Sequence, residues 1–195
     1  RDYYASRGLG DVYKRQRVTR AVPDGGPIEA HTDLVKKLDY ECELAVVLGK
    51  DARDVPAGQT RDYIFGYTIL NDVSARDVQT AHKQWYFGKS LDGFTPIGPC
   101  IVTADAFADY PPRLGIRSFV NGEKRQDSNT ALQIFDIDHV IAELSQGMTL
   151  KAGTIIATGT PAGVGMGMDP PQFLKPGDVV RCEIEGIGTL TNPVK

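Results

Sequence analysis

Apolar residues in this chain fall into short runs separated by turn residues, a pattern typical of β-strands rather than long helices. Many of these runs end near glycine or proline, and the chain contains 21 Gly and 12 Pro. Tight turns between short strands rely on these two residue types. We therefore expect strands over residues 39–48, 63–70, 97–103, 114–120, 154–158, 178–184 and 188–191.

A hairpin and a helix complete the predicted elements. Asn121-Gly122 follows one of the apolar runs and is typical of a type I′ turn, so a return strand should begin at Glu123. A helix is predicted over 138–146, where the apolar residues share one face and Gly147 supplies a stop. This balance predicts a β-rich α+β fold with a rolled, mixed sheet and one clear helix.

The segment 39–48 alternates between two faces. One face is an unbroken apolar set consisting of Tyr40, Cys42, Leu44, Val46 and Leu48. Glu41 and Glu43 therefore project together from the other face, about 7 Å apart along the strand. Because Ala45 and Val47 continue that second face, it should not be simply solvated. Two neighbouring carboxylates in such a setting repel each other, and a cation would relieve the repulsion. The alternative is an exposed acidic strand edge.

Asp72 favours the metal site over the acidic edge. It follows the apolar run 63–70 and Asn71, at a point where a strand gives way to a loop. Three oxygen ligands with no His or Cys nearby suit a hard, octahedral ion that keeps water ligands. The sequence therefore predicts that Glu41, Glu43 and Asp72 hold Mg²⁺ or Mn²⁺ rather than Zn²⁺, with open positions for a bidentate substrate.

Composition excludes several classes of protein. The 195 residues fit one domain, and their formal net charge is −3 with no segment dominated by Lys or Arg, which argues against a nucleic-acid partner. No apolar run approaches the ~18 residues that a membrane-spanning helix needs. Cys42, Cys100 and Cys182 are widely spaced and lie in apolar, strand-like runs. We expect them to be small core residues of a protein in the reducing cytoplasm.

Five motifs occur in order along the chain and together resemble the fumarylacetoacetate hydrolase family. They are DYECELAVVLGK (39–50), GYTILNDVSARDVQ (66–79), QWYFGKSLDGFTPIGP (84–99), IIATGTPAGVG (155–165) and LKPGDVVRCEIEGIGTLTNPV (174–194). The resemblance implies a β-roll, usually in a homodimer, with one divalent ion. The 84–99 motif looks most like bacterial 2-hydroxyhepta-2,4-diene-1,7-dioate isomerases and 2-oxo acid decarboxylases.

The resemblance also implies roles for individual residues. The metal ligands of the family, an E-x-E pair and an Asp, fall on Glu41, Glu43 and Asp72. By the same resemblance Arg76 and Gln79 reach the substrate or brace the metal site.

Three more residues acquire roles in this way. Lys89 would point its ammonium at the substrate, and Gly159-Thr160 would bind the substrate carboxylate through a backbone N–H and a hydroxyl. Without the motif, Lys89 would be interpreted as a solvated loop lysine. For Arg76, a plain ion pair with Asp77 or another acidic neighbour stays open.

The N-terminal part departs from the family pattern. Many members carry an upstream His, with a Glu three residues later, that activates water or shuttles protons, and residues 1–30 contain no His. We expect residues 1–16 to be an atypical, foreign leader and 17–195 to be a single catalytic domain.

The predicted function is metal-enolate chemistry on a small 2-oxo (di)carboxylic acid or acylpyruvate. Isomerisation and decarboxylation are the favoured reactions, and C–C hydrolysis ranks below them. One alternative is a truncated, dimeric metal-binding scaffold without turnover. Another is a sugar- or nucleotide-binding β domain without metal.

Overall fold

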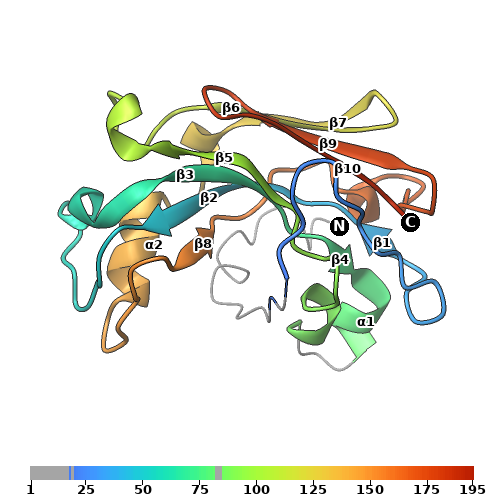
Figure 1. Cartoon of the computed structure of the whole chain (residues 1–195), viewed down its shortest axis with the longest axis horizontal. Coiled ribbons are helices and arrows are strands. Elements are labelled where there is room, and N and C mark those ends of the chain that lie inside the picture. The colour runs from blue at the N-terminus through green and yellow to red at the C-terminus, as the bar shows by residue number, and fades with distance from the viewer. Residues whose placement is uncertain (1–17, 19, 82–84) are drawn as a thin grey trace.

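The computed structural model describes residue 18 and residues 20–81 and 85–195. The predicted leader over residues 1–16 lies outside the described residues. Two four-stranded antiparallel sheets lie one above the other (Figure 1). In spatial order the first contains β5 (Ile97–Thr103), β3 (Ile64–Asn71), β2 (Cys42–Leu48) and β8 (Ile155–Ala157). The second contains β10 (Gly188–Pro193), β9 (Val179–Ile184), β6 (Gly115–Val120) and β7 (Glu123–Asn129).

Two short strands and two helices flank these sheets. Strand β1 (Leu38–Asp39) pairs with β4 (Ser74–Ala75), and α1 (Arg76–Ala81) follows directly. Helix α1 lies on the side of the first sheet that faces away from the second sheet (Figure 1). Helix α2 (Ile137–Leu144) is capped by the Asp136 side chain, which accepts a hydrogen bond from a backbone N–H in the first turn. No helix among the described residues is long and apolar enough to cross a membrane.

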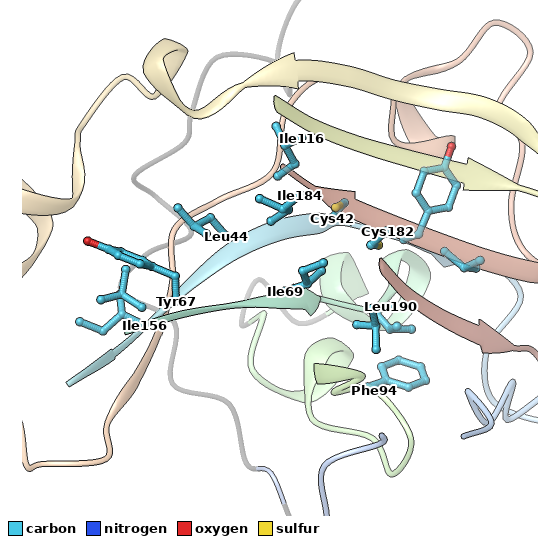
Figure 2. Packing of buried hydrophobic residues seen from close by; sticks show 14 of the residues in the cluster. Cys42, Leu44, Tyr67, Ile69, Phe94, Ile116, Ile156, Cys182, Ile184 and Leu190 are labelled. Atoms are coloured by element: carbon cyan, nitrogen blue, oxygen red, sulfur yellow. The ribbon is translucent and has the colours of Figure 1, made fainter. Parts of the chain in front are cut away.

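The core lies between the two large sheets. Figure 2 shows Cys42 and Ile69 of the first sheet meeting Cys182 and Ile184 of the second. Facing sheets bury the alternate residues of each strand in this way. Within the two large sheets only strand β2 is buried along its whole length, and its seven residues are buried on both faces. The face that carries Glu43 is therefore not an exposed edge.

The predicted β-rich class and the helix near 138–146 are confirmed. The sheets are antiparallel and not mixed as expected, because every pair of named strands is antiparallel; the parallel pairings between described residues are isolated bridges, Val22 with Pro96 and Ile28 with Val194. Each predicted strand is present with its ends shifted by a few residues. Helix α1 was not predicted, because six residues are too few to show a helical period.

One prediction about the cysteines was wrong. Cys42 and Cys182 are buried as expected, but Cys100 is exposed. Strand β5 is an edge strand, and its pairing with β3 is irregular between Tyr67 and Ile69, beside Cys100. An edge strand has one neighbour only, so an apolar run there can still present side chains to the surface.

Candidate active site

Three carboxylates converge where β2 begins and β3 ends. The register pairs Cys42 with Asn71, so Glu41, just before β2, lies beside Asp72, just after β3. The Asp72 N–H donates to the Glu41 carbonyl at 2.8 Å, and the Asn71 side chain accepts from the Glu41 N–H at 3.0 Å. One oxygen each from Glu41, Glu43 and Asp72 lies within 4.8 Å of the others, and all three residues are buried. The geometry expected from the sequence is present, while their binding of a metal stays a prediction.

Lys89 is directed at these carboxylates. It ends the 3₁₀ turn Phe87–Lys89, and its side chain is 0% exposed. Its Nζ lies 2.7 Å from Glu41 Oε2 and also forms an ion pair with Asp72. Gly88 allows the turn to approach α1, since a Cβ there would lie 2.7 Å from the backbone N of Gln79. Lys89 therefore braces the acidic cluster, and its predicted contact with substrate remains a prediction.

Arg76 makes a second bridge within the cluster. It begins α1, and its Nη1 lies 2.7 Å from Glu41 Oε1 and donates to Gln79 Oε1 at 3.2 Å. Its Nε donates to Asp39 Oδ2 at 2.9 Å, a partner that the sequence analysis did not identify. The neighbour Asp77 instead accepts from the backbone N–H of Lys36. Gln79 thus accepts from Arg76, and Arg76 in turn pairs with Glu41, a metal-ligand candidate.

The cluster as described carries more negative than positive charge. Its four carboxylates face two cations, which leaves a formal charge of −2, and the members are Asp39, Glu41, Glu43, Asp72, Arg76 and Lys89. Burial raises the pKa of Glu43 well above its usual range, and the charges of Asp72 and Glu41 raise it further. A buried site with this excess of negative charge matches a divalent cation in sign and magnitude.

The charge on Lys89 is stabilised by the same surroundings. Burial alone lowers the pKa of the ammonium, but the carboxylates of Asp72 and Glu41 outweigh burial and raise it above its usual value. The Arg76 guanidinium behaves alike, since Glu41 and Asp39 raise its pKa against the effect of burial. Both side chains are therefore permanent cations that hold the carboxylates in place.

The glycine-rich loop after β8 is tied to β2. The Gly159 N–H donates to Glu43 Oε2 at 2.8 Å, and the Thr160 hydroxyl donates to the Cys42 carbonyl at 2.9 Å. Gln126 of β7, also missed in the sequence, accepts from the Cys42 N–H at 3.1 Å and donates to Thr160 Oγ1 and the Pro161 carbonyl, both at 2.8 Å. A buried glutamine on a hairpin strand shows no local signal of such a role.

A cavity of about 830 Å³ opens beside the cluster. Glu41, Arg76 and Gln79 line it together with the loop residues Gly159 and Thr160. Its lining also includes apolar side chains, among them Leu44, Ile116, Leu132, Ile134 and Phe135. Four of the predicted site residues thus line one cavity together with a metal-ligand candidate. Lys89 is not part of the cavity lining and lies behind Glu41. The cavity can hold a small anionic molecule with an apolar extension.

Comparison with known proteins agrees with this geometry. Residues 12–195 match the family described as fumarylacetoacetate (FAA) hydrolase C-terminal. The chain is 48% identical over 183 residues to "Oxaloacetate tautomerase YisK" of Bacillus subtilis (strain 168), which covers 94% of this chain and 60% of that protein. The chain thus spans about three fifths of the length of this relative.

Solved structures show the same relationship. A fumarylacetoacetate hydrolase (EaFAH) from psychrophilic Exiguobacterium antarcticum superposes with a TM-score of 0.86 at 52% identity, over 89% of this chain and 62% of that chain. A 2-hydroxyhepta-2,4-diene-1,7-dioate isomerase from Mycobacterium marinum gives a TM-score of 0.78 at 44% identity, over 88% of this chain and 64% of that chain. The chain belongs to the fumarylacetoacetate hydrolase family, of which it carries the C-terminal domain.

Proposed function

We propose that this domain moves a proton next to the carbonyl of a small 2-oxo acid, as a metal-dependent tautomerase or isomerase. The observation that carries the proposal is the buried triad of Glu41, Glu43 and Asp72, of which Glu41 also lines the cavity. The relatives named as an oxaloacetate tautomerase and a dienedioate isomerase support the class of reaction. Decarboxylation of a 2-oxo acid draws on the same chemistry and is the second reaction to assay.

The residues present fit a divalent ion. Three carboxylate oxygens within 4.8 Å of one another and a formal charge of −2 suit Mg²⁺ or Mn²⁺. When bound, such an ion acts as a Lewis acid that makes a proton beside a carbonyl easier to remove. We expect Glu41, Glu43 and Asp72 to be its protein ligands.

The other residues would bind and orient the substrate. The Arg76 guanidinium presents fixed positive charge in the lining of the cavity, where it can pair with a substrate carboxylate. Gln79 and Thr160 line the same cavity and offer hydrogen bonds to an anionic oxygen. Lys89, behind Glu41, adds a permanent positive charge that stabilises negative charge gathering on the substrate oxygens.

A longer substrate is a second candidate, favoured by the shape of the cavity. At about 830 Å³ it is much larger than a four-carbon acid requires, and several of its lining residues are apolar. Of these, Leu132 and Ile134 are exposed and available to cover the carbon chain of a dienedioate. Comparing oxaloacetate with a hydroxy-heptadienedioate therefore tests how much of the cavity the substrate uses.

The deciding experiment follows the loss of enol absorbance of oxaloacetate with and without Mn²⁺ or Mg²⁺. We expect turnover with the ion, none after treatment with EDTA, and none in Glu43→Gln. Glu183→Gln is the matched control, because Glu183 is also a strand carboxylate but lies on the other sheet, paired with Arg181. Metal binding that depends on Glu43 without any turnover would instead indicate a non-catalytic metal scaffold. Absence of metal binding would indicate a plain ligand-binding domain.

A further inference from the structure

The carboxylate of Asp39 accepts hydrogen bonds from four donors beside the acidic cluster. The side chain is 0% exposed. Its Oδ1 accepts from the backbone N–H of Tyr40 at 2.9 Å and of Gly165 at 2.7 Å. Its Oδ2 accepts from Arg76 Nε at 2.9 Å and from the Met166 N–H at 3.0 Å. Such charge-assisted bonds are about twice as strong as neutral ones.

Three of these donors come from two different parts of the cavity lining. Arg76 belongs to α1, whereas Gly165 and Met166 belong to the loop after β8, and both Arg76 and Met166 line the cavity. Asp39 itself does not line it. A residue behind both walls thus sets their separation without touching a molecule in the cavity.

The bond to Arg76 also sets the direction of the guanidinium. That group is planar and rigid, so holding Nε on Asp39 directs Nη1 toward Glu41 at 2.7 Å and Gln79 at 3.2 Å. Arg76 therefore lies between a structural carboxylate and a metal-ligand candidate. If Asp39 were neutral, Arg76 would keep only the Glu41 charge and could turn toward it.

The loop depends on Asp39 through its backbone. A Cβ at Gly165 would lie 1.9 Å from the Gln172 carbonyl and 2.9 Å from Asp39 Oδ1, so only glycine permits this approach. The Tyr40 hydroxyl donates to the Gly163 carbonyl at 2.8 Å and attaches the same loop to the same segment. The short segment 39–40 thereby holds the loop at Gly163, Gly165 and Met166.

We infer that Asp39 is a positioning residue, whose carboxylate fixes Arg76 and loop residues 163–167 as the two walls of the substrate cavity. The inference rests on the proposed function only in taking the cavity to be the substrate site. Asp39 acts through Arg76 and the loop. Its loss should therefore weaken ligand binding and make the loop less ordered.

A double-mutant cycle tests the action through Arg76. Asp39→Asn keeps the size of the side chain and removes its charge, and Arg76→Gln removes the partner. The probes are the KM for oxaloacetate and the Kd of oxalate for the Mn²⁺-loaded protein. We expect Asp39→Asn to raise both by at least about tenfold alone, and by several-fold less than that on top of Arg76→Gln, where only the effect through the loop remains. If the fold-change of the double variant equals the product of the two single fold-changes, Asp39 does not act through Arg76.

The matched control is Asp178→Asn. Asp178 is also a buried carboxylate that accepts from a backbone N–H, that of Lys175, but its side-chain partner is Asn121 at the far hairpin. It should lower thermal stability and leave the KM and the oxalate Kd within about twofold of the wild type. If Asp39→Asn shifts the two ligand constants no more than this control does, the inference is wrong.

A ligand-free measurement separates this inference from the proposed function. In metal-free protein, the amides of Gly165 and Met166 should exchange hydrogen at least about tenfold faster in Asp39→Asn than in Asp178→Asn. Unchanged exchange overturns the inference. If the wild type neither turns over oxaloacetate nor binds oxalate, the proposed function fails while the exchange rates still decide the role of Asp39.

A second variant covers the case in which Asp39→Asn yields no folded protein. Arg76→Lys keeps the charge, but one ammonium cannot span Asp39 and Glu41 as the guanidinium does. It should weaken oxalate binding at least about fivefold while metal-free folding is retained. Binding equal to that of the wild type would show that the bridge between Asp39 and Glu41 has no positioning role.

Discussion

Replacing Lys89 with methionine tests the charge balance of the buried cluster. Methionine keeps most of the volume of the side chain and removes only the ammonium, which lies 2.7 Å from Glu41 Oε2 and also pairs with Asp72. Without Lys89 the formal charge of the described cluster changes from −2 to −3. Removing one partner of a buried ion pair costs about 3–5 kcal/mol of unfolding free energy. For a chain of 195 residues this corresponds to a fall in Tm of about 10 °C.

The same change should strengthen the response to metal. A more negative site binds a divalent ion more tightly, and a ligand that binds only the folded state stabilises it by RT ln(1 + [L]/Kd). If the affinity for Mn²⁺ rises about tenfold, saturating Mn²⁺ adds about 1.4 kcal/mol more stability to Lys89→Met than to the wild type. The difference in Tm between the two proteins should therefore narrow by about 4 °C when Mn²⁺ is present.

Differential scanning calorimetry of metal-free and Mn²⁺-saturated protein measures both effects. Lys124→Met is the matched control, because Lys124 also pairs with a carboxylate, Asp127, but both side chains are about half exposed. Its unfolding free energy should change by less than about 1 kcal/mol. A Lys89→Met protein as stable as this control, with an unaltered change in Tm on addition of Mn²⁺, would refute the charge balance on which the metal site rests.

In turnover assays, Lys89→Ala should lower kcat more than it raises KM, because the cation stabilises charge that develops during the reaction.

Three further predictions concern the support of the site and its assembly. Gln126→Leu should lower the free energy of unfolding in urea by about 3 kcal/mol, because buried backbone groups of β2 and of the loop after β8 lose their hydrogen-bond partner. Gln146 is exposed, so Gln146→Leu should change the free energy of unfolding little. Gly163→Ala should destabilise far more than Gly177→Ala by the same measurement. Both glycines have positive φ, but a Cβ at Gly163 would lie 2.1 Å from the Arg125 carbonyl and one at Gly177 meets nothing within 4 Å; equal losses would mean that the loop simply moves aside. We also propose a homodimer, for which sedimentation equilibrium at micromolar concentration should give twice the chain mass, and a monomer would count against it.

Local pattern in the sequence determined the strands and the core of the site. Strict alternation in 39–48 placed Glu41 and Glu43 on one side of a strand, and this works because side-chain direction in a strand depends only on the neighbouring residues. The end of the apolar run before Asp72 likewise marked where β3 stops. Five ordered motifs then identified the family, which the comparisons show.

Tertiary structure alone decided how those residues are held. Asp39 meets Gly165 across 126 positions of the chain, and Gln126 meets Cys42 across 84, so no local period signals either contact. Lys89 is a loop lysine in the sequence, and only the approach of its turn to α1 buries it against Glu41 and Asp72. Exposure of Cys100 follows from the position of β5 at a sheet edge, which strand order fixes and hydrophobicity does not. Burial and charge compensation arise from contacts between distant segments, and those contacts exist only once the two sheets have packed.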